Sequence, residues 1–128
     1  MNSNHQDIQS LLAYDDIIKC SGYTTLDKIL HIKPGEKFSS VVFVDAIKEV
    51  VTSRLHKLMA FVAVEDLTGK QEVIFFPRTY KVYEHMLKER EVIYLTCQRD
   101  TAEIDINTNE CQKVKVIGLS VEHLDEKQ

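Results

Sequence analysis

Residues 58–77 read LMAFVAVEDLTGKQEVIFFP and carry the strongest structural signal in the chain. Two apolar runs, LMAFVAVE and QEVIFF, are rich in the β-branched and aromatic residues that favour strands. The segment between them favours a tight turn, with a positive φ at Gly69 and a bond from the Asp66 side chain to the backbone two residues on. Pro77 cannot donate a ladder hydrogen bond, so it ends the second strand and suits the first position of a helix. This stretch therefore predicts a β-hairpin followed by a helix.

The rest of the chain adds three more strands and completes one helix. Residues 38–50 are rich in valine, isoleucine and phenylalanine, and their length suits a strand that bends to serve two sheets of a small barrel. Polar residues 52–57 then make a hairpin connection. Tyr80 and Tyr83 fall at helical spacing and are expected to plug one end of the barrel. In chain order the sequence predicts strands at 38–50, 58–65 and 71–76, a helix over 78–88, and strands at 91–98 and 114–121.

This order of three strands, one helix and two strands fits one architecture. Hairpin-length links between the first three strands exclude parallel βαβ repeats. Five strands with a helix between the third and fourth are the arrangement of the oligonucleotide-binding (OB) fold, a Greek-key barrel. The expected fold class is therefore mainly β, a five-stranded OB-fold barrel over residues 38–121. A partly helical N-terminal arm or linker at 1–37, with short helices from Asp7 and over 25–31, precedes it, and a charged tail at 122–128 follows.

The composition fits one globular domain in a reducing compartment. A length of 128 residues and a hydrophobic fraction of 44% are enough for a single core. No apolar run reaches about 18 residues, and the polar N-terminus lacks the pattern of a signal peptide. Cys20, Cys97 and Cys111 are odd in number and widely spaced, which favours reduced thiols over a disulfide framework or a zinc site. The sequence therefore predicts a cytoplasmic protein that does not enter a membrane.

The charge of the chain permits nucleic-acid binding without predicting it. The net charge is −4, which opposes sequence-blind attraction to a phosphate backbone. The negative excess lies in the flanks, because residues 38–98 hold eight basic and eight acidic residues. A neutral block of this kind is compatible with a basic groove on one face.

Three short motifs occur at fixed spacing between Met59 and Tyr80. Met59-Ala-Phe is followed by an Asp-Leu-Thr-Gly turn that ends at Gly69, and then by Phe-Pro-x-x-Tyr80. Together they resemble the OB domain of bacterial DNA polymerase III alpha subunits, and the resemblance extends over about residues 36–98 and loosely over 113–121. It implies a piece of a much larger polymerase, without the catalytic section, that touches the template single strand ahead of the active site.

The hairpin connection at 52–57 departs from that family. It lacks the usual glycine and is slightly longer, although Arg54 and Lys57 keep its basic character.

Candidate binding residues follow from the way OB folds hold single strands. Bases stack on aromatic side chains and phosphates lie beside cations, on the face of strands 2 and 3 and on the loops after strands 1 and 4. Alternation places Phe75 in the core and Phe76 near the surface, because Glu72 shares the face of Phe76. The same argument does not decide which way Phe61 points. The expected nucleic-acid-binding residues are Lys48, Arg54, His56, Lys57, Phe61, Lys70 and Phe76.

The sequence shows no catalytic or metal-site pattern. The five histidines lack ligand spacing, and there is no glycine-rich phosphate loop or nucleophile elbow. Asp15 and Asp16 are adjacent and would diverge on a helix, and nothing near Glu103 and Asp105 supplies a third ligand. We therefore expect no catalysis by this chain alone, no cofactor and no small-molecule substrate.

The expected partners are single-stranded DNA and other polymerase or replisome subunits. Two alternatives to single-strand binding stay open. One is a protein-interaction OB domain that docks another replisome subunit. The other is an RNA-binding OB domain of the anticodon-binding kind, which the polymerase-like motif spacing disfavours.

Overall fold

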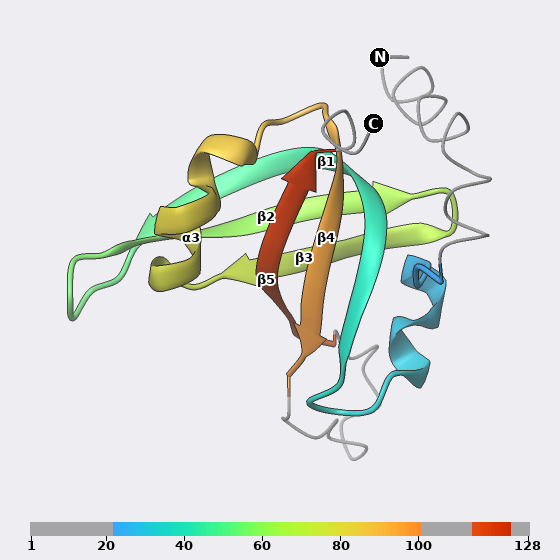
Figure 1. Ribbon diagram of the computed structural model, residues 1–128. Helices are drawn as coiled ribbons and strands as arrows, with labels where there is room; N and C mark the ends of the chain where they lie inside the picture. Colours follow the sequence, from blue (N-terminus) through green and yellow to red (C-terminus); the bar gives the residue numbers. More distant parts are fainter. Residues whose placement is uncertain (1–21, 101–113, 124–128) are drawn as a thin grey trace.

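The computed structural model describes residues 22–100 and 114–123, which form a mainly β fold (Figure 1). The expected order of three strands, one helix and two strands is confirmed, and every strand end lies within two residues of its expected place. The helix expected from Asp7 lies outside the described residues. The elements are η1 (Leu26–His31), β1 (Lys37–Val51), β2 (Leu58–Asp66), β3 (Gly69–Phe75), α3 (Pro77–Tyr83), η2 (Glu84–Met86), β4 (Val92–Arg99) and β5 (Val116–His123).

The five strands close into a barrel in the order β1-β2-β3-β5-β4. All neighbours are antiparallel except β3 and β5, which run parallel and join the two halves of the sheet. The prediction that the first strand bends to serve two sheets is confirmed. Residues 37–43 of β1 pair with β4 and residues 43–51 pair with β2. An irregularity between Val44 and Ala46 marks the change, and such bulges increase the local bend of a strand.

The barrel interior is filled by alternate side chains of each strand. Val62 and Val73 are fully buried, and Phe75 is the largest side chain with no exposed surface. The Phe75 ring lies against the backbone of Gly118 on β5, where a Cβ atom would be only 2.5 Å from Cζ of the ring. A side chain at position 118 would therefore displace the central aromatic ring of the core.

One end of the barrel is closed by α3, as the sequence predicts. Tyr80 is buried and Tyr83 packs against the same core. The Tyr80 hydroxyl donates a 2.6 Å hydrogen bond to Oε2 of Glu49 on β1. Burial, together with this bond to a carboxylate, raises the pKa of the Tyr80 phenol above its ordinary value. The ring therefore ties the helix to the long strand beside it.

The helix expected over 78–88 is shorter than the sequence predicts. α3 ends at Tyr83, one 3₁₀ turn follows, and the backbone becomes extended at Leu87 with φ −93° and ψ 106°. Leu87 is buried in the core, which requires the chain to turn inward before β4. No helix among the described residues is long and apolar enough to cross a membrane.

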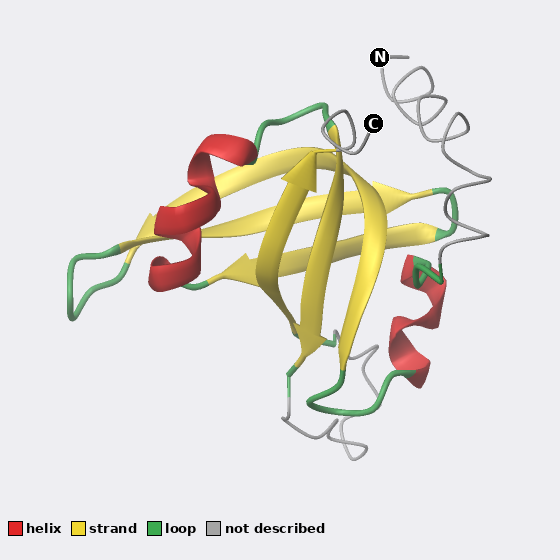
Figure 2. Ribbon diagram, in the orientation of Figure 1, coloured by secondary structure: helices red, strands yellow, loops and turns green. Residues whose placement is uncertain are grey.

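The helical turn expected over 25–31 is present as η1, which lies along the outside of the barrel next to β1 (Figure 2). Its Leu26 and Ile29 side chains belong to the main core. The backbone N–H of Leu26 donates to Oδ2 of Asp66 at 2.9 Å. At the other end of η1, the Arg99 guanidinium donates to the carbonyls of Leu30, at 3.3 Å, and Ile32. The segment is thus fastened to the barrel at both ends.

The β2–β3 turn confirms one expectation and corrects another. Asp66 Oδ1 accepts hydrogen bonds from the Thr68 N–H at 2.8 Å, the Thr68 hydroxyl at 2.6 Å and the Gly69 N–H at 3.1 Å. The expected positive φ at Gly69 is wrong, because the positive-φ glycines of the described chain are Gly22 and Gly35. The aspartate side chain holds the chain reversal, so the turn does not need a left-handed glycine.

Candidate nucleic-acid interface

The outer face of β1, β2 and β3 collects four of the residues that the sequence singled out. Phe61 on β2 pairs with Lys48 on β1 and with Ile74 on β3. Because alternate residues of a strand share a face, Lys70 and Phe76 lie on the same outer face as Ile74. Lys48, Phe61 and Ile74 therefore form one row across three neighbouring strands, with a cation at one end and two apolar side chains beside it.

The orientation of the phenylalanines is now settled. Phe75 is 0% exposed and Phe76 is 46% exposed, so the expected orientation of this pair is confirmed. Phe61, which the sequence left undecided, points outward because its neighbours Val62 and Ala60 fill the core. It remains half-buried. Two aromatic rings on one open sheet face are the kind of platform on which unpaired bases stack.

The other three candidates lie on the β1–β2 hairpin, at one end of this face. Arg54, His56 and Lys57 are exposed, and Figure 1 shows the loop as the green projection beyond α3. The loop is closed by Thr52, whose N–H donates to the Lys57 carbonyl at 2.8 Å. The structure therefore places the three residues on one loop, with Lys57 at its base, away from Lys70, which lies at the far end of β3.

A groove of about 740 Å³ lies on the outer face, bordered by η1, β2, β3 and the chain entering β5. Lys70 and Lys115 are its cations, and Asp27, Asp45 and Glu72 are its carboxylates. A hydrogen bond from the Thr25 hydroxyl lowers the pKa of the Asp27 carboxyl, which keeps its negative charge in place. Acidic side chains outnumber basic ones in this groove, so its charge alone does not favour phosphate.

Sequence reasoning missed Lys115. Its position beside β3 depends on the parallel pairing of Ile74 with Ile117, which joins two strands far apart in the chain. No local pattern carries this information.

A second hollow, of about 480 Å³, lies between the β1–β2 hairpin and α3. Lys57, Arg78 and Lys81 line it together with one carboxylate, Glu84. Arg78 and Lys81 entered the sequence analysis only as charges, although their spacing of three residues puts them on one side of a helix. Basic residues therefore outnumber acidic ones in the hollow between the hairpin and α3, whereas acidic residues outnumber basic ones in the groove on the outer face.

These features define the class of the molecule. A closed barrel in the order β1-β2-β3-β5-β4, with a helix between β3 and β4, is an OB-type barrel. Within the described ranges no group of three His, Cys, Asp or Glu side chains is placed to hold a metal ion.

Comparison with known proteins finds similarity to a DNA polymerase subunit. Over 55 residues, 43% of its length, the chain is homologous to the DNA polymerase III subunit alpha of Streptococcus pyogenes, with 36% identity. The alpha subunits of serotypes M1 and M6 of that organism match to the same extent. The matched stretch is only 5% of the length of each relative. No protein-family model matches the chain.

Proposed function

We propose that this OB-type barrel binds single-stranded DNA on the outer face of β1, β2 and β3, as a non-catalytic piece of a replicative polymerase that positions the template in the cytoplasm. The row formed by Lys48, Phe61 and Ile74, with Phe76 on the same face, is the observation that carries the proposal. The homology to a polymerase alpha subunit supports a role in replication.

In this proposal the sheet face binds mainly the bases of the strand, and the hairpin binds its phosphates. Bases stack on Phe61 and Phe76, with each stacked base contributing about 1–3 kcal/mol. Phosphates lie beside Lys48 and the hairpin cations Arg54 and Lys57, which border the same face. Phe61 and Ile74 also line the acidic groove, so its carboxylates repel the phosphates toward the hairpin end while the bases stack on Phe61.

Fluorescence anisotropy of a labelled oligo(dT) at two salt concentrations tests this proposal. The Arg54→Ala/Lys57→Ala variant should bind more weakly and reduce the magnitude of the log–log salt slope by about 1.4, since each single-strand phosphate contact contributes about 0.7. Phe61→Ala should weaken binding by about 5- to 150-fold with the slope unchanged, because stacking releases no counterions. Lys33→Ala, on the loop before β1, is the control. Wild-type protein that does not bind at low salt, or variants indistinguishable from Lys33→Ala, would refute the proposal.

A second candidate function is the docking of another polymerase or replisome subunit. The net charge of −4 and the acidic excess in the groove favour it. The two functions differ in their dependence on salt, because phosphate contacts weaken steeply as counterions compete.

A further inference from the structure

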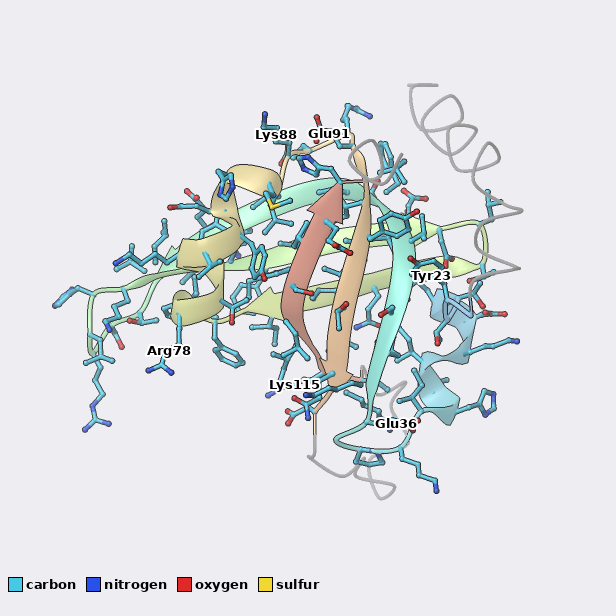
Figure 3. The ribbon with its side chains drawn as sticks, viewed as in Figure 1. Tyr23, Glu36, Arg78, Lys88, Glu91 and Lys115 are labelled. Atoms are coloured by element: carbon cyan, nitrogen blue, oxygen red, sulfur yellow. The ribbon has the colours of Figure 1, made fainter. Side chains whose placement is uncertain are left out.

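The hollow between the β1–β2 hairpin and α3 combines exposed cations with exposed aliphatic side chains. Its cations, Lys57, Arg78 and Lys81, face solvent from two different elements. Figure 3 shows Arg78 projecting from the start of α3 away from the strands. Opposite charge in the lining comes from Glu84. An anionic ligand is therefore attracted to this hollow more strongly than to the acidic groove.

Aliphatic side chains are exposed at the same place. Leu58 at the start of β2 is 37% exposed and Val82 on α3 is 56% exposed, and both line the hollow. Leu55 at the hairpin tip is 69% exposed. These three side chains are not part of the hydrophobic core, so packing of the barrel does not require aliphatic residues at these positions. Apolar area of this kind contributes about 25 cal/mol per Å² when a partner covers it.

The chemistry of the lining favours a peptide over a nucleic acid. The hollow has one aromatic residue, Tyr80, which is 4% exposed and whose hydroxyl already donates to Glu49. No ring face is therefore open for a base, whereas Leu58 and Val82 suit an aliphatic side chain.

We infer that this hollow docks an acidic peptide segment of another protein, with an aliphatic side chain between Leu58 and Val82 and carboxylates beside Lys57, Arg78 and Lys81. This site gives a location and a partner chemistry to the docking function and does not depend on single-strand binding at the outer face. The volume of about 480 Å³ is within the range of about 300–1,000 Å³ that ligand pockets span.

The test uses a short fluorescein-labelled peptide in which glutamates flank a pair of leucines, and a matched peptide with serines in place of the leucines. The leucine peptide should bind the full chain more tightly than the serine peptide. Arg78→Glu/Lys81→Glu should weaken its binding about tenfold, and Val82→Ser should weaken it several-fold. Lys33→Glu/Lys88→Glu carries the same change in net charge on exposed residues away from the hollow, and Figure 3 shows Lys88 well apart from Arg78. This control should change peptide binding less than twofold.

Three outcomes would overturn the inference: no binding of the leucine peptide at low salt, equal binding of the two peptides, or equal losses in the two double variants. Thermal unfolding of each variant confirms that the barrel is intact. Oligo(dT) binding separates this site from the outer face, because Arg78→Glu/Lys81→Glu should reduce it no more than Lys33→Glu/Lys88→Glu does. Loss of oligo(dT) binding in Phe61→Ala with peptide binding retained would support two sites that have only Lys57 in common.

Discussion

His56 concentrates the backbone strain of the β1–β2 hairpin. Its φ of 51° lies in the left-handed region, which costs a residue with a Cβ atom about 1–2 kcal/mol. Two hydrogen bonds to Thr52 hold the loop in this form, one from the His56 N–H to its carbonyl at 2.9 Å and one from the Lys57 N–H to its hydroxyl at 3.1 Å. The hairpin contains no glycine to relieve the strain.

Two different substitutions at His56 should change the free energy of unfolding in opposite directions. We expect His56→Gly to raise the free energy of unfolding by up to about 1 kcal/mol, because relief of strain exceeds the added freedom of the unfolded chain. His56→Val should lower it by about 1–2 kcal/mol, since a β-branched residue tolerates this conformation poorly. Urea denaturation measures both. Ser53→Gly, in the same loop but without a positive φ, is the control, and a comparable gain there would contradict this account.

The close approach of the Phe75 ring to Gly118 predicts that a side chain at position 118 destabilises the protein. Gly118→Ala should lower the free energy of unfolding by about 1–3 kcal/mol, because the new Cβ atom would overlap the buried ring. Gly69→Ala is a matched control, since a Cβ atom there has no neighbour within 4 Å. It should leave stability unchanged or raise it by about 0.4–1 kcal/mol. Equal effects in the two variants, measured by urea denaturation, would exclude the proposed overlap.

At the scale of elements, η1 is held to the barrel by polar contacts at its ends and by apolar packing between them. The Arg99 side chain is buried, and its guanidinium satisfies carbonyls at the end of η1 that have no partner within such a short helix. The ring of Tyr23 stacks on Tyr94 of β4 at 5.2 Å, and covers the outside of the sheet next to η1. Residues 23–32 therefore pack against the barrel.

Removal of the Arg99 guanidinium should loosen η1 from the barrel. Arg99→Met keeps much of the side-chain volume but leaves the Leu30 and Ile32 carbonyls without their donor, which we expect to cost about 1–3 kcal/mol. Hydrogen exchange should then show loss of protection at the amides of Lys28 and Ile32, whose N–H groups bond within this segment. Arg78→Met, on the exposed side of α3, should change stability by less than about 0.5 kcal/mol. Unchanged exchange in Arg99→Met would contradict the role given to this side chain.

At the scale of the whole molecule, the closed barrel buries a titratable thiol. Cys97 is 1% exposed, and burial raises the pKa of its thiol above the ordinary value of 9.0. The folded protein therefore holds this proton at pH values at which the unfolded chain releases it. The stabilising contribution is complete below pH 9 and is lost as the pH rises above it, because ionisation then favours the unfolded chain.

Alkaline unfolding should reveal this group. In a Cys20→Ser/Cys111→Ser background, the free energy of unfolding should fall between pH 9 and 10.5 with a contribution from Cys97 that approaches about 1.4 kcal/mol per pH unit. Cys97→Ala in the same background should give a shallower fall, whatever its stability at neutral pH. Reaction with a thiol reagent at pH 8 provides a second measurement, because the buried thiol should react only through unfolding. Rapid labelling of the folded protein would show that Cys97 is accessible.

The element order was predictable because it depends on neighbours in the chain. Three local preferences were confirmed: the alternation of Phe75 and Phe76, the proline at the first position of α3, and the aspartate of the β2–β3 turn. The length of α3 was wrong because burial of Leu87, a tertiary contact, ended the helix early. The positive φ at Gly69 was wrong because the Asp66 side chain holds that turn.

The amino-acid sequence by itself determined the OB-type barrel and the residue types available for binding. Only the tertiary structure decided where those residues lie. Strand order and register placed Lys48 beside Phe61, and the parallel β3–β5 pairing brought Lys115 into the groove. Docking of α3 against the hairpin gathered Arg78 and Lys81 around Lys57. The physical reason is that strand formation responds to local backbone and side-chain preference, whereas the distribution of charge over a surface depends on contacts between segments far apart in the chain.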